Sequence, residues 1–365
     1  MSELINTHDN RATIRWKLLT GASALALTAY VSSTVLAKAE DASRPQIWIE
    51  LGTEFTGLES ANEPYLPPFV LPPYFLGSSR APFITESPAG FQKSAPSTWD
   101  ENAKITFEPK GADWAVSVGI VYGRSSNQRS LRQQTANHFL SSGGSPGHGY
   151  AAYQRTDAQT RETHLILDFQ VGKDVGLGMF GHNGHSRINL GVRYAQFNAR
   201  NKADVFYQPT NSHYAYQLFH GSFEAKRHFI GVGPSLSWEG SAGLAGNTED
   251  GGLSVDWSVN GAVLFGRQRV RGHHQTTQLS VTYPSAAGKT VVYQSPAAIS
   301  RSKQVAVPNL GGSAGFSWHY ANAKMTLGYR YDRFFGAIDG GIDAAKKEDR
   351  AFYGPFASIS IGLGD

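Results

Sequence analysis

Cysteine is absent from the 365-residue chain, and after the N-terminal stretch there is no apolar run of about 20 residues. Without cysteine the protein has no disulfide, no thiol nucleophile and no Cys-ligated metal, which suits export into an oxidising periplasm. Without a long apolar run it has no later membrane-spanning helix. The mean hydropathy of −0.32 is that of a soluble protein, but membrane barrels hide their apolar side chains in alternation.

The N-terminal residues 1–39 have the pattern of a cleaved signal peptide. A basic segment at 11–17 precedes an apolar stretch at 18–36 and an A-x-A cleavage site at 37–39. An uncleaved helical anchor is the alternative, because the apolar stretch is nearly long enough to span a membrane. Its Gly, Ser and Thr content and the A-x-A site favour cleavage. The mature protein is then expected to consist of residues 40–365.

Alternation of apolar and polar residues is the dominant pattern of the mature chain. In 114–122 and 163–171, nearly every second residue is apolar, and Gly, Ser, Asp and Gln fill half of the positions between them. A period of two is that of β-strands. Ten strands are expected, around 47–55, 105–107, 114–122, 163–171, 187–194, 230–238, 253–265, 310–320, 325–331 and 353–363.

A soluble β-sandwich alternates in the same way, so two further features are needed to choose a membrane barrel. Trp114 and Tyr122 lie about 26 Å apart along one strand, which resembles the two aromatic girdles of outer-membrane barrels. Connections also alternate in length: long ones fall at 57–100, 125–160, 201–224 and 271–301, with a shorter one at 339–348 on the same side. The intervening connections, at 109–112, 173–184, 240–251 and 321–322, are shorter. Long loops at one end and short turns at the other are typical of barrels in the Gram-negative outer membrane.

The sequence therefore predicts an all-β protein, a transmembrane antiparallel up-and-down barrel of about ten strands. Two of the long connections, at 204–219 and 277–294, have hairpin patterns of their own. Each arm has only about seven residues, fewer than the 9–11 that a tilted spanning strand needs. We interpret them as hairpins above the membrane, although counts of twelve or fourteen strands stay open.

Five short sequence motifs give further support for the barrel. They are LDFQVG at 167–172, LGVRYA at 190–195, GVGP at 231–234, GYRYDR at 328–333 and YGPF at 353–356. These segments resemble the group of major outer membrane and pore-forming proteins typified by Legionella, over roughly the C-terminal two thirds of the chain. The resemblance implies an outer-membrane barrel that forms a pore.

The C-terminus departs from the usual pattern of such barrels, which commonly end in an aromatic residue. This chain ends in Leu363, Gly364 and Asp365. Recognition by the barrel assembly machinery, an expected partner, would then rest on the aromatic residues at 352–356.

Charged residues recur on the polar face of the expected strands, with both signs on neighbouring strands. One interpretation is a lumen filled by ion pairs, because buried charges must be paired. The other is a charged constriction that filters solutes. Eight strands give a packed interior and sixteen or more an open channel, so ten strands favour the filled lumen. The expected lumen charges are Glu50, Glu54, Lys104, Glu108, His164, Asp168, Arg187, Arg193, Asp256, Arg330 and Asp332.

Paired prolines mark the segment 65–75, within the long connection 57–100. Such pairs favour a stiff, extended polyproline geometry. The apolar side chains of the segment would be poorly placed in water, so we expect it to fold over the mouth of the barrel. Docking to a partner protein is the alternative.

A basic cluster is expected on the outer rim. Arg267, Arg269 and Arg271 continue the lipid-facing register of one strand, and Arg200 and Lys226 lie at the same level of adjoining strands. These side chains could hold lipopolysaccharide phosphates by charge-assisted hydrogen bonds. An ordinary solvated rim is the alternative.

Two functions follow. The first is a narrow, loop-gated pore for small solutes; the second is a structural or adhesive barrel that binds lipopolysaccharide or an external ligand through its loops. An enzyme is not expected: five histidines, at 213, 220, 228, 273 and 274, fall on the outer side, but no catalytic motif accompanies them. We expect no cofactor and no metal. Removing 1–39 lowers the net charge from +4 to +2, so nucleic acid is not an expected partner.

Overall fold

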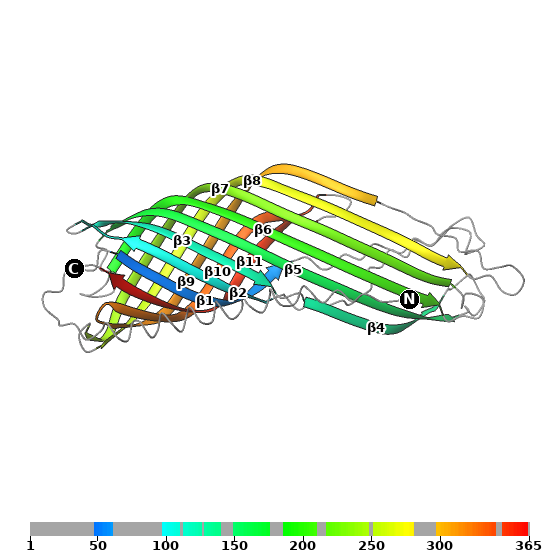
Figure 1. Ribbon diagram of the computed structural model, residues 1–365, viewed down its shortest axis with the longest axis horizontal. Coiled ribbons are helices and arrows are strands. Elements are labelled where there is room, and N and C mark those ends of the chain that lie inside the picture. Colours follow the sequence, from blue (N-terminus) through cyan, green and yellow to red (C-terminus); the bar gives the residue numbers. More distant parts are fainter. Residues whose placement is uncertain are drawn as a thin grey trace, which may run out of the picture. The chain divides into compact units, whose positions relative to one another are not determined.

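The computed structural model describes residues 47–60, 97–109, 112–125, 128–139, 149–175, 185–209, 217–247, 251–280, 297–340 and 345–363. Within them lie eleven strands joined into one antiparallel sheet (Figure 1). In chain order they are β1 (Ile47–Ser60), β2 (Ser97–Phe107), β3 (Trp114–Ser125), β4 (Gln128–Phe139), β5 (Gly149–Asp174), β6 (His185–Pro209), β7 (Gln217–Asn247), β8 (Gly251–Ser280), β9 (Ala297–Tyr320), β10 (Ala323–Asp339) and β11 (Lys347–Leu363).

The sheet closes into a barrel through strand β5. Its C-terminal part pairs with β3, from Trp114↔Lys173 to Arg124↔Thr163, and its N-terminal part pairs with β4. Strand β4 therefore continues the line of β3 along the same edge of β5 and adds no place to the ring. The barrel has ten positions, in the order β1-β2-β3-β5-β6-β7-β8-β9-β10-β11. This confirms the predicted antiparallel barrel of about ten strands.

The alternating sequence decides which face of each strand turns outward. Large apolar side chains stand exposed at every second position of most strands, for example Val118, Phe169, Leu190 and Phe316. Between them lie small or polar residues that are buried, as in the run Ser254, Ser317 and Ser358 of β8, β9 and β11. This apolar-out, polar-in arrangement is the reverse of a soluble sandwich and suits a wall of lipid chains.

Strands β5 to β8 are longer than the sequence pattern predicted. They have 26, 25, 31 and 30 residues and extend well beyond β1, β2 and β3 (Figure 1). The expected connections 125–160, 201–224 and 271–301 were therefore too long, since most of their described residues are strand. Apolar alternation stops where a strand leaves the lipid, but backbone pairing continues.

The two expected hairpins differ in how far the structure describes them. The arms of 204–219 are continuations of β6 and β7, paired from Asp204↔Ser222 to Tyr207↔Phe219. The first residues of 277–294 continue β8 as far as Ser280, and residues 281–296 lie outside the described part of the chain.

Both ends of the barrel wall meet at one end of the molecule, where Ile47 pairs with Leu363. We call this the terminal end, and the opposite one the loop end. A two-residue turn at the terminal end, Ala321 and Asn322, joins β9 and β10, with Ala321 at a φ of 49°. The expected signal peptide (1–39) and the proline-rich segment (65–75) lie outside the described residues. Within the described part, no helix is long and apolar enough to cross a membrane.

Candidate functional site

The lumen is lined by the inward-facing side chains of all ten wall positions, and they meet in layers. From the terminal end to the loop end these are a set of terminal ion pairs, a central network around Arg193, an aromatic layer and an outer charged layer. Each layer joins strands that are far apart around the ring, so each crosses the lumen.

The terminal ion pairs lie nearest the chain ends. Lys104 of β2 donates to Glu239 of β7 at 2.8 Å, four wall positions away. Arg187 pairs with Glu108, and Lys324 pairs with Asp256. These side chains keep 15–32 % of their surface exposed, so water reaches this end of the lumen.

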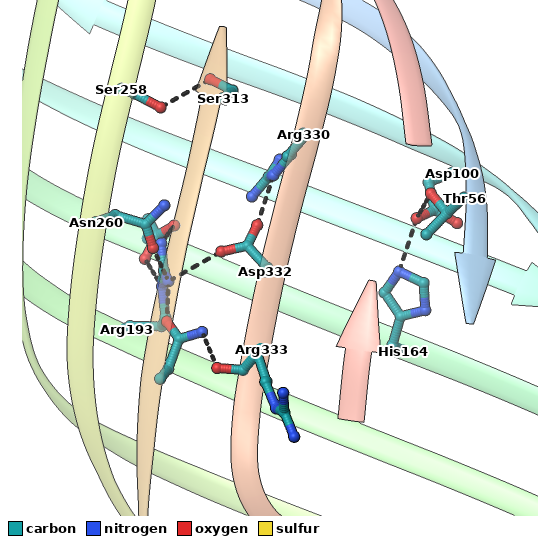
Figure 2. Close-up of polar contacts among 12 residues, drawn as sticks. Thr56, Asp100, His164, Arg193, Ser258, Asn260, Ser313, Arg330, Asp332 and Arg333 are labelled. Carbon is teal, nitrogen blue, oxygen red and sulfur yellow. Dashed lines mark hydrogen bonds and ion pairs between the residues drawn. The ribbon is translucent and has the colours of Figure 1, made fainter. Parts of the chain in front are cut away.

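The central network is built on Arg193 of β6, which is 3 % exposed. Its guanidinium donates to both carboxylate oxygens of Asp168, at 2.7 and 2.9 Å, and to Asn260 at 2.7 Å. It also bonds Asn309 and lies 4.0 Å from Asp332 (Figure 2). Asp332 in turn accepts from Arg330 at 2.6 Å. Two cations, the buried Arg193 and the partly exposed Arg330, are thus matched by two carboxylates.

Glycine makes room for this network. A Cβ at Gly311 would overlap the carboxylate of Asp332 and crowd the amide of Asn260. Gly123 plays the same part for a second buried pair: its Cβ would overlap Asp100 and His164. His164 lies 3.0 Å from Asp100, which also accepts from Thr56 at 2.5 Å (Figure 2).

The aromatic layer consists of Phe197, Phe229, Phe334 and Phe352, which are 0–6 % exposed. Phe197 of β6 and Phe352 of β11 come from wall positions on opposite sides of the ten-strand ring, yet their ring centroids are 5.5 Å apart. Phe334 lies 4.8 Å from Phe197 and 5.9 Å from Phe352. Leu58, Leu264 and Val307, each 0 % exposed, complete the same apolar cluster. At this level apolar side chains from opposite walls therefore meet across the lumen.

The outer charged layer lies on the loop-end side of the phenylalanines. Arg350 of β11 reaches Glu162 of β5 at 3.5 Å, four wall positions away. Arg301 pairs with Asp339 at 3.2 Å, and Arg227 donates to the Asp339 carbonyl at 3.1 Å. A bulge in β10 at Gly336, where φ is 63°, turns Ala337, Ile338 and Asp339 inward together.

All eleven charges expected in the lumen lie on its inward face. The expected occurrence of both signs on neighbouring strands is present, since Asp168 of β5 pairs with Arg193 of β6, and Arg187 pairs with Glu108. The outer charged layer, Glu239, Lys324 and the aromatic layer were not foreseen. One signal was available for Phe197: it follows Arg193 and Ala195 at the same inward spacing of two residues.

The expected rim bases lie on the outward face of the loop-end strand extensions. Arg200 pairs directly with Lys226 across strands, and Lys226 with Arg271. Glu224 accepts from Arg200 at 2.9 Å and lies 3.4 Å from Lys226. Burial raises the pKa of Glu224, but hydrogen bonds from Arg200 and Lys226 outweigh it, and the net pKa is lowered. Glu224 is therefore ionised at neutral pH.

Of the five histidines expected on this side, His213 lies outside the described residues. His228 and His273 lie on β7 and β8, but directly opposite other partners: Arg269 for His228 and Glu224 for His273. Among the described residues, no group of three or more His, Cys, Asp or Glu side chains is arranged to hold a metal ion.

Comparisons with known proteins bear on the barrel as a whole. A search of curated proteins finds no match. The transport unit of the autotransporter AIDA-I from Escherichia coli is 8% identical, covering 93% of this chain and 97% of its own, at a TM-score of 0.25. A TodX monoaromatic hydrocarbon channel mutant is also 8% identical, covering 88% and 91%, at a TM-score of 0.22.

A family match is more specific. Residues 117–362 match the family described as Legionella pneumophila major outer membrane protein precursor. The matched segment runs from β3 to β11 and contains eight of the ten wall positions, together with the five motifs quoted above. The chain is therefore an outer-membrane β-barrel that belongs to the Legionella major outer membrane protein family.

Proposed function

We propose that the protein is a structural outer-membrane barrel whose lumen is closed to solutes and whose outer surface makes its functional contacts. The observation that carries this proposal is the contact of Phe197 with Phe352 from opposite walls. A channel that passes solutes needs a water-filled path, and its lining side chains would be exposed to water. The phenylalanines at this level are 0–6 % exposed.

The energy of opening supports the same proposal. Phenylalanines packed in a protein interior each contribute about 3–5 kcal/mol relative to alanine. Separating the aromatic layer would also pull apart the charge pairs on either side of it, such as Arg350 with Glu162. Breaking a buried pair is strongly unfavourable, because each charge then lacks a partner. A barrel that functions as an open pore would not contain contacts that cost so much free energy to separate.

A gated narrow pore is the second candidate. The partly exposed terminal ion pairs favour it, because a hydrated, charged vestibule is what a solute would first enter. An apolar layer beyond a polar vestibule also resembles the hydrophobic constrictions that gate channels by dewetting. In that case the aromatic layer would be the gate.

Planar-bilayer recording of the refolded protein tests the two candidates. A closed structural barrel gives no steady unit currents, whereas a pore gives them, and steady currents from the unmodified protein would overturn the proposal. The double variant Phe197→Ala with Phe334→Ala removes two rings of the aromatic layer and is expected to raise conductance. Phe316→Ala is the matched control, because Phe316 is 61% exposed on the lipid-facing side. Heat-modifiable gel migration verifies that each variant is folded.

A further inference from the structure

Four basic side chains form one continuous row on the outward face of the loop-end strand extensions. Arg161 of β5 pairs directly with Arg200 of β6, Arg200 with Lys226 of β7, and Lys226 with Arg271 of β8. Directly opposed side chains lie about 4.5–5.5 Å apart at Cβ, where like charges repel. Four bases in succession are therefore costly to the free barrel, which points to an anionic ligand.

The neighbouring rows add charge of the same sign. On the side toward the apolar band, Arg269 and Arg267 follow Arg271 at successive outward positions of β8; on the other side Lys202 stands opposite Glu224. We call Arg161, Arg200, Lys202, Lys226, Arg267, Arg269 and Arg271 the basic rows. Glu224 is the acid that lies among them, and Asp157 and Asp204 stand one row farther out. The positive charge of the rows exceeds the negative charge around them.

The basic rows begin where the lipid-facing band ends. Ile230 lies opposite Arg267, and Val232 lies opposite Phe265, which is 60% exposed. A molecule whose acyl chains lie against this band would carry its headgroup to the level of the rows. The ligand should therefore be an amphiphile with anionic groups just above its chains.

We propose that the basic rows bind the phosphates of lipopolysaccharide in the outer leaflet. The loop end faces outside in barrels with this layout, and lipopolysaccharide is the amphiphile of that leaflet. The main row crosses four strands, about 14 Å, which is wider than one phosphodiester needs and suits the several phosphates of one lipopolysaccharide. Arg and Lys form charge-assisted hydrogen bonds with phosphate oxygens. This inference rests on the part of the proposed function that places the functional contacts on the outer surface, and it does not depend on whether the lumen conducts.

The test removes charge from the row and measures lipid binding. The triple variant Arg161→Gln, Lys226→Gln, Arg271→Gln is compared with a matched control, Lys173→Gln, Lys346→Gln, Lys347→Gln, whose bases are exposed but lie off the rows. Refolded proteins in detergent are titrated with purified lipopolysaccharide, with its dephosphorylated form and with phosphatidylglycerol. A chelator is present, so that divalent cations cannot bridge lipid and protein.

The unmodified protein and the control are expected to bind lipopolysaccharide alike, more weakly as salt increases. The triple variant should bind about tenfold more weakly or worse, because three charge-assisted contacts are lost. Glu224→Gln should bind more tightly, since it removes the acid among the bases. A folded triple variant that binds like the control would overturn the site. Equal binding of phosphatidylglycerol or of dephosphorylated lipopolysaccharide would overturn the assignment to lipopolysaccharide phosphates.

Discussion

At the scale of single residues, Arg193 shows how a charge is kept inside a membrane protein. The guanidinium has two bonds to Asp168, further bonds to Asn260 and Asn309, and a second carboxylate, Asp332, at 4.0 Å. A planar group with five donors in a fixed geometry can serve all these partners at once, and a lysine cannot. The cost of burying charge is offset only while every partner is present.

Replacing Arg193 by methionine should therefore destabilise the barrel by about 3–5 kcal/mol, because Asp168 and Asp332 lose their shared cation. Urea unfolding of the refolded protein in lipid vesicles measures the change. Adding Asp168→Asn to this variant should recover part of the loss, since it removes one unpaired charge. Two losses that simply add would contradict the coupling inferred from the contacts.

At the scale of strands, the barrel has two different regions. Below the basic rows each strand has a lipid-facing side and a lumen-facing side. Above them β6 and β7 stay paired as far as Tyr207↔Phe219, with β5 along the other edge of β6 and β8 along the other edge of β7. We call this outer part of the β6–β7 pair the ribbon. The aromatic and charged layers of the lumen lie below this ribbon, so its outermost turns contribute little to closing the barrel.

Shortening the ribbon should therefore leave the barrel intact. In the variant that replaces residues 205–221 by Asn-Gly, a two-residue turn would join Asp204 to its partner Ser222. We expect unchanged heat-modifiable migration and a urea midpoint close to that of the full protein. Loss of the compact band on the gel would mean that the ribbon is needed for folding.

At the scale of the whole molecule, the decisive contact is the pairing of β3 with β5, which closes the ring. Without it the sheet would have two free edges, which are not tolerated in a bilayer because unpaired backbone groups face lipid. The break between β3 and β4 lets one edge of β5 be covered along its full length by two shorter strands.

Because the natural chain has no cysteine, an engineered pair can test this closure directly. Val118 and Phe169 lie opposite each other across β3 and β5, within the Cα separation that a disulfide accepts. Val118→Cys with Phe169→Cys should form a disulfide in the folded protein, seen as a shift on a non-reducing gel. The diagonal pair Val118→Cys with Leu167→Cys is the control and should link poorly, since diagonal neighbours are too far apart. Equal linking of both pairs would argue against the register.

Some of this architecture could be read from local patterns and some could not. Alternation at Val118, Phe169 and Leu190 is a property of neighbouring residues, so fold class and strand number were accessible from sequence. The inward placement of Asp168 and Arg193 follows from the same period. The predicted ends of β5 to β8 were wrong. Apolar alternation occurs only where a strand contacts lipid, so the sequence gives no such signal where two strands pair in water.

The sequence by itself determined that residues alternate in and out of an antiparallel wall, because side-chain direction in a strand changes with every residue. Only the tertiary structure decided that aromatic side chains from opposite walls meet across the lumen. Phe197 and Phe352 are far apart along the chain and stand on opposite walls, and their contact depends on the number of strands in the ring. The row from Arg161 to Arg271 likewise depends on the registers of three strand pairs, β5–β6, β6–β7 and β7–β8. These registers are set by pairing between strands.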